Sequence, residues 1–427
     1  MIKIATNKFF LITVSLLCLC ILCLGICIIP SILPPTPPPP EEEAWPSWAP
    51  DGRSLAYVCY LEGPIEGRSQ FEITFDINYP RPAAPWSQYT AEAADICIIN
   101  VDGHNRKRLT QELGKEWGPV WSPDGSRIAY LRLDGIYIIN VDGSNKHRLA
   151  EGQVAYEQRY GVDKAHIAWS PDGNQVLFSA CLKNLDADVY LVNVNNGMII
   201  NLTPNSRKHD VEPRWTFDGS KILFLSTASS VWPGTCGLTN DAPHQIKVIN
   251  ADGSNERVIY KELYYPFIAV SNTGQITFVS DMVSETANEY WDNNYYRIPA
   301  SLYTMRIDDL EPVEVLDATQ GKLRLILYSW SPDEKHLLYR DESRKFKILN
   351  IEEREARELP SVESLFDVEA YPELGHFSWS PNGQQIAATV YLTKGGDEDG
   401  GDNYTYLEKY IYIFNLQDDI ISPLIEK

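Results

Sequence analysis

The chain has 427 residues, 44% of them hydrophobic, which suffices to bury one large core or two ordinary ones. It carries 58 acidic against 37 basic side chains, a formal net charge of −21. A surface this acidic repels phosphate backbones, which argues against nucleic acid as a partner.

The N-terminal segment contains an uncharged apolar run at residues 9–29, FFLITVSLLCLCILCLGICII. A run of this length can cross a bilayer as one helix. Lys3 and Lys8 precede it and three glutamates follow at 41–43, so the positive-inside rule keeps the N-terminus cytoplasmic. We expect residues 1–33 to be a single-pass anchor to the cell membrane, with the rest extracytoplasmic and periplasmic. A cleaved signal peptide is the alternative.

Residues 34–43, PPTPPPPEEE, predict a stiff polyproline spacer with an acidic end. Beyond it, residues 44–427 repeat one phrase, written WGPVWSPDGSRIAY at 117–130 and AHIAWSPDGNQVLF at 165–178. Alignment gives seven copies, the fifth of them degenerate (AVSNTGQITF). The position of the motif tryptophan is held by Trp48, Trp121, Trp169, Trp215, Val270, Trp330 and Trp379.

Each copy predicts part of a four-stranded antiparallel unit. In the copy at 117–130, GPVW is a strand, SPDG a tight turn and SRIAYL a second strand. IYIINV then predicts a third strand, Asp142 and Gly143 a hairpin turn, and KHRLA a fourth strand. Seven such units can bury their faces against one another around an axis. We therefore predict an all-β fold, a seven-bladed β-propeller of four-stranded antiparallel blades, preceded by one N-terminal transmembrane helix. Six blades are the alternative if the fifth copy is not a blade.

The WSPDG phrase, followed by two apolar strands and an xDG hairpin, resembles the TolB-type (WD40-like) β-propeller repeat over nearly all of residues 44–427. The resemblance implies the fold and little about activity, since propellers host many functions. TolB itself has an α/β domain before six blades, whereas this chain has an apolar run, a spacer and seven repeats. A role in the Tol envelope system is therefore not implied.

The residues of the motif itself are expected to be structural, with tryptophans packed between blades and aspartates forming turns. These aspartates are Asp51, Asp124, Asp172, Asp218 and Asp333. The sequence contains no GxSxG, HExxH, GxGxxG or P-loop motif, and we expect no catalytic activity. Similar repeats precede the catalytic domain of peptidases of the prolyl oligopeptidase type, and we expect no such domain after the seventh copy.

Long insertions fall between the second and third strands of blades one, four, five and seven, at roughly 61–94, 227–244, 280–301 and 393–409. These connections all open on one face, here called the decorated face; the SPDG and xDG turns define the opposite, plain face. Because scaffolds commonly carry function on loops, we expect the decorated face to bind a protein or peptide in the cell envelope. Candidate binding residues are Trp86, Tyr89, Trp232, Tyr290, Trp291, Tyr295, Tyr296, Tyr404 and Tyr406. Packing of the loops onto the rim would use the same rings.

The mouth of the central channel on the decorated face is a second candidate site. The residues expected there stand three before each motif position: Trp45, Gly118, His166, Glu212, Phe267, Leu327 and His376. His166, Glu212 and His376 are side chains that bind metals or move protons. Some seven-bladed lyases of uronic-acid oligomers resemble this repeat and hold a metal with channel histidines. The alternative function is accordingly a carbohydrate-binding or metal-dependent, lyase-like propeller.

No cofactor is predicted, although a divalent cation at the channel mouth or in the acidic loop 397–402 stays an alternative. Four cysteines lie outside the apolar run. Cys59 and Cys97 fall in neighbouring strands of blade one, and Cys181 and Cys236 fall on the decorated face of adjacent blades. An exported domain can keep disulfides, so we predict both pairs.

Overall fold

The repeated phrase folds as a strand, a tight turn and a second strand in its successive copies. The structure, a computed structural model, describes residues 43–60, 94–112, 116–132, 134–154, 156–159, 162–164, 167–181, 186–204, 208–228, 237–238, 244–263, 265–271, 273–280, 301–308, 311–316, 326–341, 345–362, 365–366, 371–394 and 405–425. The predicted anchor and spacer lie outside these residues. Within them, no helix has the length and apolar character needed to cross a bilayer.

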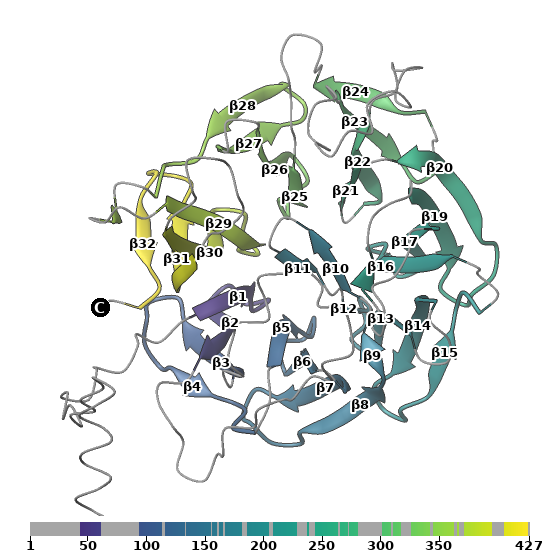
Figure 1. Ribbon diagram of the computed structural model, residues 1–427, viewed down its shortest axis with the longest axis horizontal. Coiled ribbons are helices and arrows are strands. Elements are labelled where there is room, and N and C mark those ends of the chain that lie inside the picture. The colour runs from purple at the N-terminus through teal and green to yellow at the C-terminus, as the bar shows by residue number, and fades with distance from the viewer. Residues whose placement is uncertain are drawn as a thin grey trace, which may run out of the picture. The chain divides into compact units, whose positions relative to one another are not determined.

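The described strands form seven antiparallel blades around one axis, with the first strand of each blade innermost (Figure 1). Blades one to three contain β1 (Glu43–Trp48), β2 (Ser54–Tyr60), β3 (Ala94–Asn100) and β4 (Lys107–Arg108); β5 (Glu116–Trp121), β6 (Arg127–Arg132), β7 (Gly135–Asn140) and β8 (His147–Glu151); β12 (Ile167–Trp169), β13 (Gln175–Cys181), β14 (Asp188–Asn193) and β15 (Ile199–Asn201). The short strand β9 (Gln153–Val154) also pairs with β13.

Blades four to seven follow the same order. They contain β16 (His209–Trp215), β17 (Lys221–Thr227), β19 (His244–Asn250) and β20 (Arg257–Leu263); β21 (Tyr265–Val270), β22 (Gln275–Ser280), β23 (Ser301–Arg306) and β24 (Val313–Leu316); β25 (Ile326–Trp330), β26 (His336–Arg340), β27 (Phe346–Asn350) and β28 (Glu355–Glu358); β29 (Tyr371–Trp379), β30 (Gln385–Lys394), β31 (Thr405–Asn415) and β32 (Ile421–Pro423). The degenerate fifth copy therefore builds a complete blade, and the prediction of seven blades is confirmed.

The motif aspartates are turn residues. In blade two, Asp124 Oδ1 accepts hydrogen bonds from the Ser122 hydroxyl at 2.5 Å and from the Ser126 N–H at 3.0 Å. Asp172, Asp218 and Asp333 accept the corresponding pair of bonds in their own turns. The Ser122 hydroxyl and the Ser126 amide lower the pKa of Asp124 to about 2. The structural interpretation of these aspartates is thus confirmed.

The motif tryptophans join neighbouring blades. Trp121 Nε1 donates to the carbonyl of Ser47 in blade one at 3.0 Å, and Trp169 Nε1 donates to that of Val120 in blade two at 3.1 Å. Trp330 makes the same bond, at 3.3 Å, to blade five. These rings are more than nine-tenths buried, so each adds apolar contact as well as a hydrogen bond between blades.

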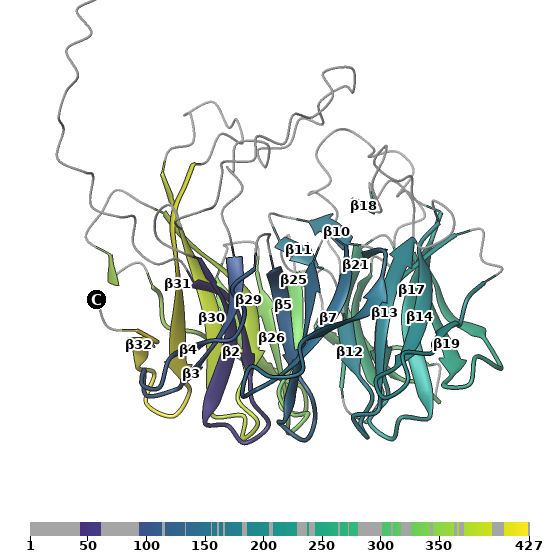
Figure 2. The same ribbon diagram turned by 90° about the horizontal axis from the view of Figure 1, so that it is seen from below.

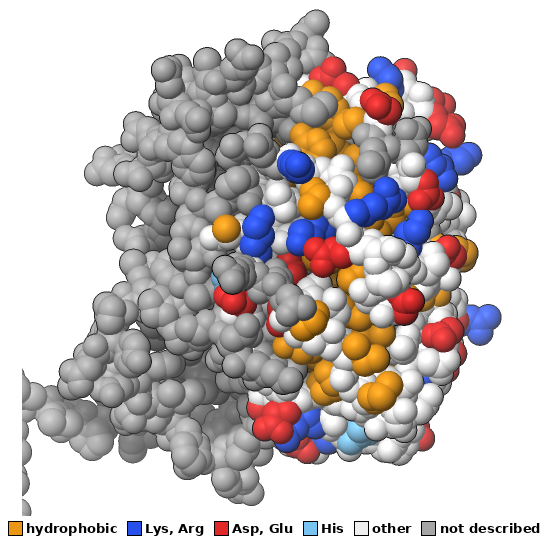
Figure 3. Space-filling view, turned by 90° about the vertical axis from the view of Figure 1, so that its right-hand side faces the viewer, with side chains coloured by type: hydrophobic (Ala, Val, Ile, Leu, Met, Phe, Trp, Pro, Cys, Tyr) orange, Lys and Arg blue, Asp and Glu red, His pale blue; other side chains and the backbone are white. Residues whose placement is uncertain are grey.

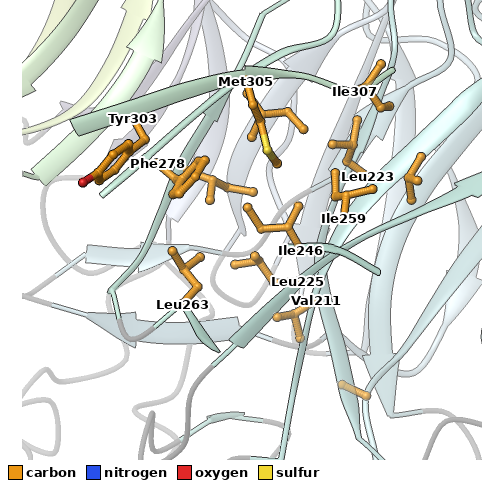
Figure 4. Close-up of a cluster of buried hydrophobic side chains, with 14 residues drawn as sticks. Val211, Leu223, Leu225, Ile246, Ile259, Leu263, Phe278, Tyr303, Met305 and Ile307 are labelled. Carbon is orange, nitrogen blue, oxygen red and sulfur yellow. The ribbon is translucent and has the colours of Figure 1, made fainter. Parts of the chain in front are cut away.

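Apolar side chains of adjacent blades pack into a shared core. Figure 4 shows one such cluster, in which Leu223, Leu225 and Ile246 of blade four pack with Phe278 and Met305 of blade five. Burying a side chain of this size contributes about 1.5–3 kcal/mol. The side of the outer wall seen in Figure 3 is mixed, with apolar patches between basic and acidic side chains.

The ring closes by packing between its first and last blades. Blade one consists of β1 to β4 and blade seven of β29 to β32, with no strand shared between these two sheets. Trp48 Nε1 donates to the Ser378 carbonyl at 3.0 Å, and the Trp45 N–H donates to Thr389 Oγ1 at 3.1 Å. A buried cluster that includes Leu55 and Ile411 fills the seam.

The predicted disulfide between Cys59 and Cys97 is present and joins β2 to β3 inside blade one. Both cysteines are buried. Cys181, at the end of β13, is also disulfide-bonded. Its predicted partner Cys236 lies outside the described residues, so that pairing stays a prediction.

Candidate functional site

The long insertions begin and end on the face opposite the SPDG turns, which is the upper side in Figure 2. In blade five, Ser280 at the end of β22 pairs directly with Ser301 at the start of β23. Tyr60 pairs with Ala94 in the same way in blade one, and Thr227 with His244 in blade four. In each of these three blades, the last residue before the insertion therefore pairs directly with the first residue after it.

Most of the candidate aromatic residues of this face lie outside the described residues: Trp86, Tyr89, Trp232, Tyr290, Trp291, Tyr295, Tyr296 and Tyr404. Tyr406 lies in β31, where its backbone pairs with that of Thr393. The acidic loop 397–402 also lies outside the described residues. The binding role of all these residues stays a prediction.

A small sheet on the decorated face was not predicted. It joins β10 (Tyr156–Arg159) and β11 (Val162–Lys164), from the link between blades two and three, to β18 (Gly237–Leu238), from the blade-four insertion. Figures 1 and 2 place β10 and β11 near the ring axis, on the upper side of the inner strands. Two connections of the decorated face are thus tied together beside the predicted channel mouth.

A β-bulge recurs in the innermost strands at the predicted mouth positions. The register shifts between Ala44 and Ser47 in β1, and equivalent shifts occur in β5, β16, β21, β25 and β29. Left-handed backbone occurs at these bulges, with φ of 60° at Trp45, 61° at Gly118, 53° at Glu212 and 49° at His376. Such a conformation costs a non-glycine residue on the order of 1 kcal/mol, and bulges re-aim side chains beside functional sites.

Trp45 and His376 meet across the seam between blades one and seven. Their ring centroids are 3.6 Å apart with an interplanar angle of 79°. Tyr391 extends the group, with its ring centroid 5.9 Å from that of His376. Trp45 and His376 are only partly buried. A partly exposed aromatic group with a polar edge can stack a sugar ring or an apolar side chain.

Glu212 is placed differently from Trp45 and His376. It is 5% exposed, and its Oε2 lies 3.5 Å from Arg214 Nη2. Phe267 and Leu327 lie at the bulges of β21 and β25, and His166 lies outside the described residues. Across the described residues, no group of three histidine, cysteine, aspartate or glutamate side chains could hold a metal. Within this part of the mouth, the structure brings together an aromatic pair and not a set of metal ligands.

A buried acidic network between blades one and two was not predicted. Asp95 is fully buried at the start of β3, and Arg108 Nη2 lies 2.5 Å from its Oδ2. Glu116 begins β5 and is 1% exposed; the Thr110 hydroxyl donates to its Oε2, and Arg132 Nη1 lies 3.6 Å from its Oε1. The pKa of Glu116 is raised to about 7: burial is the main cause, the hydrogen bond from Thr110 opposes it, and the neighbouring charge of Asp95 adds to the rise.

The same arrangement recurs between blades three and four. The Val189 N–H donates to Thr203 Oγ1 at 3.0 Å, just as the Ile96 N–H donates to Thr110 Oγ1 at 2.8 Å. Asp188 takes the place of Asp95, and burial raises its pKa. Asp210 lies five residues before Trp215, as Glu116 lies five before Trp121, and is fully buried. An acidic residue five positions before the motif tryptophan could have indicated both networks from the sequence.

Comparison with known proteins agrees with this architecture. Residues 87–233 match the family model of the TolB beta propeller domain. The uncharacterized peptidase YuxL of Bacillus subtilis is 24% identical over 206 residues, which are 48% of this chain and 24% of that protein. The chain thus aligns with about a quarter of the length of that curated relative.

Two solved structures share the fold at low identity. The β-propeller domain of the Trilobed protease from Pyrococcus furiosus, described as having an open velcro topology, is 11% identical with a TM-score of 0.55, over 90% of this chain and 96% of that one. An oligogalacturonate lyase from Vibrio parahaemolyticus is 13% identical with a TM-score of 0.54, over 88% and 91% of the two chains. The chain is thus a seven-bladed β-propeller, and its residues 87–233 match the TolB beta propeller domain.

Proposed function

We propose that the protein is a non-catalytic recognition module that binds a protein or peptide of the cell envelope through its decorated face. The observation that carries the proposal is the asymmetry of the ring. Insertions of 33 residues (61–93) in blade one and 20 residues (281–300) in blade five leave from closed hairpin pairs on one face. The plain face carries only short turns, so a partner would find its variable contacts on the decorated face.

The proposal is tested with three forms of the full-length chain used as bait in a cell-envelope extract. In one variant, Asn-Gly replaces residues 281–300; because Ser280 and Ser301 are direct partners, a two-residue turn can close this hairpin. The control is Phe217→Ala, which removes a ring that is 68% exposed in a plain-face turn. A partner held by the wild type and the control but lost from the loop variant supports the proposal. Equal retention by all three forms contradicts a role for this insertion.

We also propose that residues 9–29 anchor the chain in the membrane, with the propeller outside the cytoplasm. The support is the uncharged apolar run, preceded by two lysines and followed by three glutamates. We expect the full-length chain to stay in the membrane pellet after alkaline carbonate extraction and a chain without residues 9–29 to be released. Release of both chains would contradict the anchor.

A carbohydrate site at the channel mouth is the second candidate function. It is favoured by the contact between Trp45 and His376, since partly exposed aromatic rings are common sugar platforms. Metal analysis of the purified full-length chain distinguishes the lyase-like form of this candidate. A stoichiometric metal lost in both His166→Ala and His376→Ala would support it, and a metal content unaffected by either substitution would count against it.

A further inference from the structure

A pocket of about 290 Å³ lies between blades two and three. Its polar lining consists of Arg127, Asn140, Asn145 and His147 from blade two and Asn195 from blade three. Arg127 lies two residues after an SPDG motif and Asn145 lies in an xDG hairpin, so the pocket opens at the plain face, away from both candidate sites above. Among the described residues, no aspartate or glutamate lines it, although the chain contains 58 of them.

The pocket is present where a contact made in three other blades is missing. The ladder position of His147 is held by Lys107 in blade one, Arg257 in blade four and Arg357 in blade six. These three side chains donate to backbone carbonyls of the next blade, those of Val141, Ile307 and Leu416, at 3.4, 3.0 and 3.0 Å. His147 instead donates through Nδ1 to the Asn145 carbonyl at 2.9 Å. The space beside Val194, which occupies the place of those three acceptors, stays open.

The charges that line the pocket between blades two and three also differ from those at the equivalent place between blades four and five. Between blades four and five, Lys221 takes the place of Arg127 and Asp308 takes the place of Asn195, and Lys221 Nζ lies 2.7 Å from Asp308 Oδ1. Between blades two and three the cation is kept, while the carboxylate has become a carboxamide. Asp124 is near enough to be influenced by Arg127, but its oxygens are bonded to Ser122 and Ser126.

Two contacts fix the position of the Arg127 guanidinium group. Its Nη2 donates to the Gly173 carbonyl at 2.9 Å, and its guanidinium carbon lies 5.1 Å from the Trp169 ring centroid. Gly173 engages one of the five N–H donors of the guanidinium group, which leaves a planar fork of donors for a carboxylate. Because the fork is already fixed by two contacts, little side-chain entropy is lost on binding.

We propose that this pocket binds a small hydroxylated carboxylate whose carboxylate group pairs with Arg127 as Asp308 pairs with Lys221. The carboxamides of Asn145 and Asn195 supply donors and acceptors for the hydroxyl groups of the ligand. The pocket is at the small end of the range of ligand sites, which fits a single six-carbon sugar acid.

The test titrates the full-length protein in detergent with three probes by isothermal calorimetry. D-Gluconate carries both the charge and the hydroxyl groups, sorbitol carries the hydroxyl groups alone, and acetate carries the charge alone. We expect saturable binding of gluconate, weaker binding of acetate and none of sorbitol. Binding of sorbitol as tight as that of gluconate, or no saturation with gluconate, overturns the proposal.

Two substitutions restore the residues of the equivalent blades and should therefore preserve the fold, which circular dichroism would verify. Asn195→Asp gives Arg127 an internal partner, and His147→Arg fills the pocket with the missing contact to Val194. Each should weaken gluconate binding at least about tenfold, as expected for the loss of one charge-assisted hydrogen bond. Asn105→Asp is the control, because it makes the same charge change in the equivalent hairpin of blade one. Unchanged affinity in the first two variants, or an equal loss in the control, contradicts the site.

Discussion

Single polar residues of this protein divide into those that hold turns and those that are buried between blades. Asp124 uses its carboxylate within its own turn, and the low pKa that results is a sign of local hydrogen bonding. Glu116 lies between blades one and two with a pKa of about 7. Both are acidic residues near a motif tryptophan in the sequence, yet only Glu116 changes its charge in the physiological range.

Glu116 should make stability depend on pH. The unfolded chain loses this proton near the ordinary value of 4.5, while the native state keeps it up to about 7. Between these values the native state binds more protons, so the free energy of unfolding falls as the pH rises, by on the order of 3 kcal/mol in all. Glu116→Gln, which can still accept from Thr110, should remove this fall when urea unfolding is measured from pH 4.5 to 8.

Glu112→Gln is the matched control for that experiment. Hydrogen bonding by Lys146 lowers the pKa of Glu112, so its contribution is present at neutral pH and is lost as the pH falls. That contribution changes little above pH 4.5, so Glu112→Gln should lower stability while leaving the fall between pH 4.5 and 8 in place. A fall of stability that persists unchanged in Glu116→Gln would show that another group is responsible.

At the scale of elements, the blade is the unit that local sequence specifies most completely. SPDG turns, xDG hairpins and the apolar strands between them act over a few residues, which is why their positions could be predicted. The small sheet of β10, β11 and β18 could not, because it pairs Tyr156 with Gly237 across a whole blade. The bulges at Trp45 and His376 were also missed, since positive φ at these residue types has no local signature.

The Cys59–Cys97 disulfide should stabilise blade one measurably. It closes a loop of 38 residues, most of them in the long insertion between β2 and β3. Replacing both cysteines by serine should lower the free energy of unfolding by about 2–4 kcal/mol, through greater entropy of the unfolded chain. Urea unfolding with and without reductant checks this: reductant should destabilise the wild type more than the variant. An equal response would mean that other disulfides dominate.

At the scale of the whole molecule, the seam between blades one and seven differs from the other interfaces. Neighbouring blades elsewhere are consecutive in the chain, whereas blades one and seven are the first and the last of the ring. Packing around Trp48 and its bond to Ser378 must hold the ring closed without a covalent link. Opening of the ring should therefore begin at this seam.

Trp48→Phe tests that expectation, with Trp169→Phe as the matched substitution between blades two and three. Each removes one indole hydrogen bond to the preceding blade, at 3.0 and 3.1 Å respectively, and should lower stability by about 1 kcal/mol. Hydrogen exchange of β29 and β32 should accelerate in Trp48→Phe alone. Equal acceleration in both variants would mean that the seam is no weaker than the other interfaces.

The fold was thus predictable because seven copies repeat the same turn and the same apolar strands around it. The candidate site was predictable only in outline. Counting three residues back from the motif position located Trp45, Glu212 and His376 at the inner bulges. It did not reveal that Trp45 contacts His376 while Glu212 pairs with Arg214, because those contacts depend on how the ring closes. The pocket at Arg127 needed the structures of several blades to be compared.

The direct pairing of Ser280 with Ser301, and of Tyr60 with Ala94, has a consequence for how such proteins change. The strand residues on either side of each of these insertions pair with each other, so the ladder of the hairpin does not depend on the insertion between them. The ladder pairs, the turns and the tryptophans of the ring lie outside these insertions in the sequence, so the insertions can vary while those residues stay the same. Related chains could therefore acquire new binding preferences quickly while keeping one conserved frame.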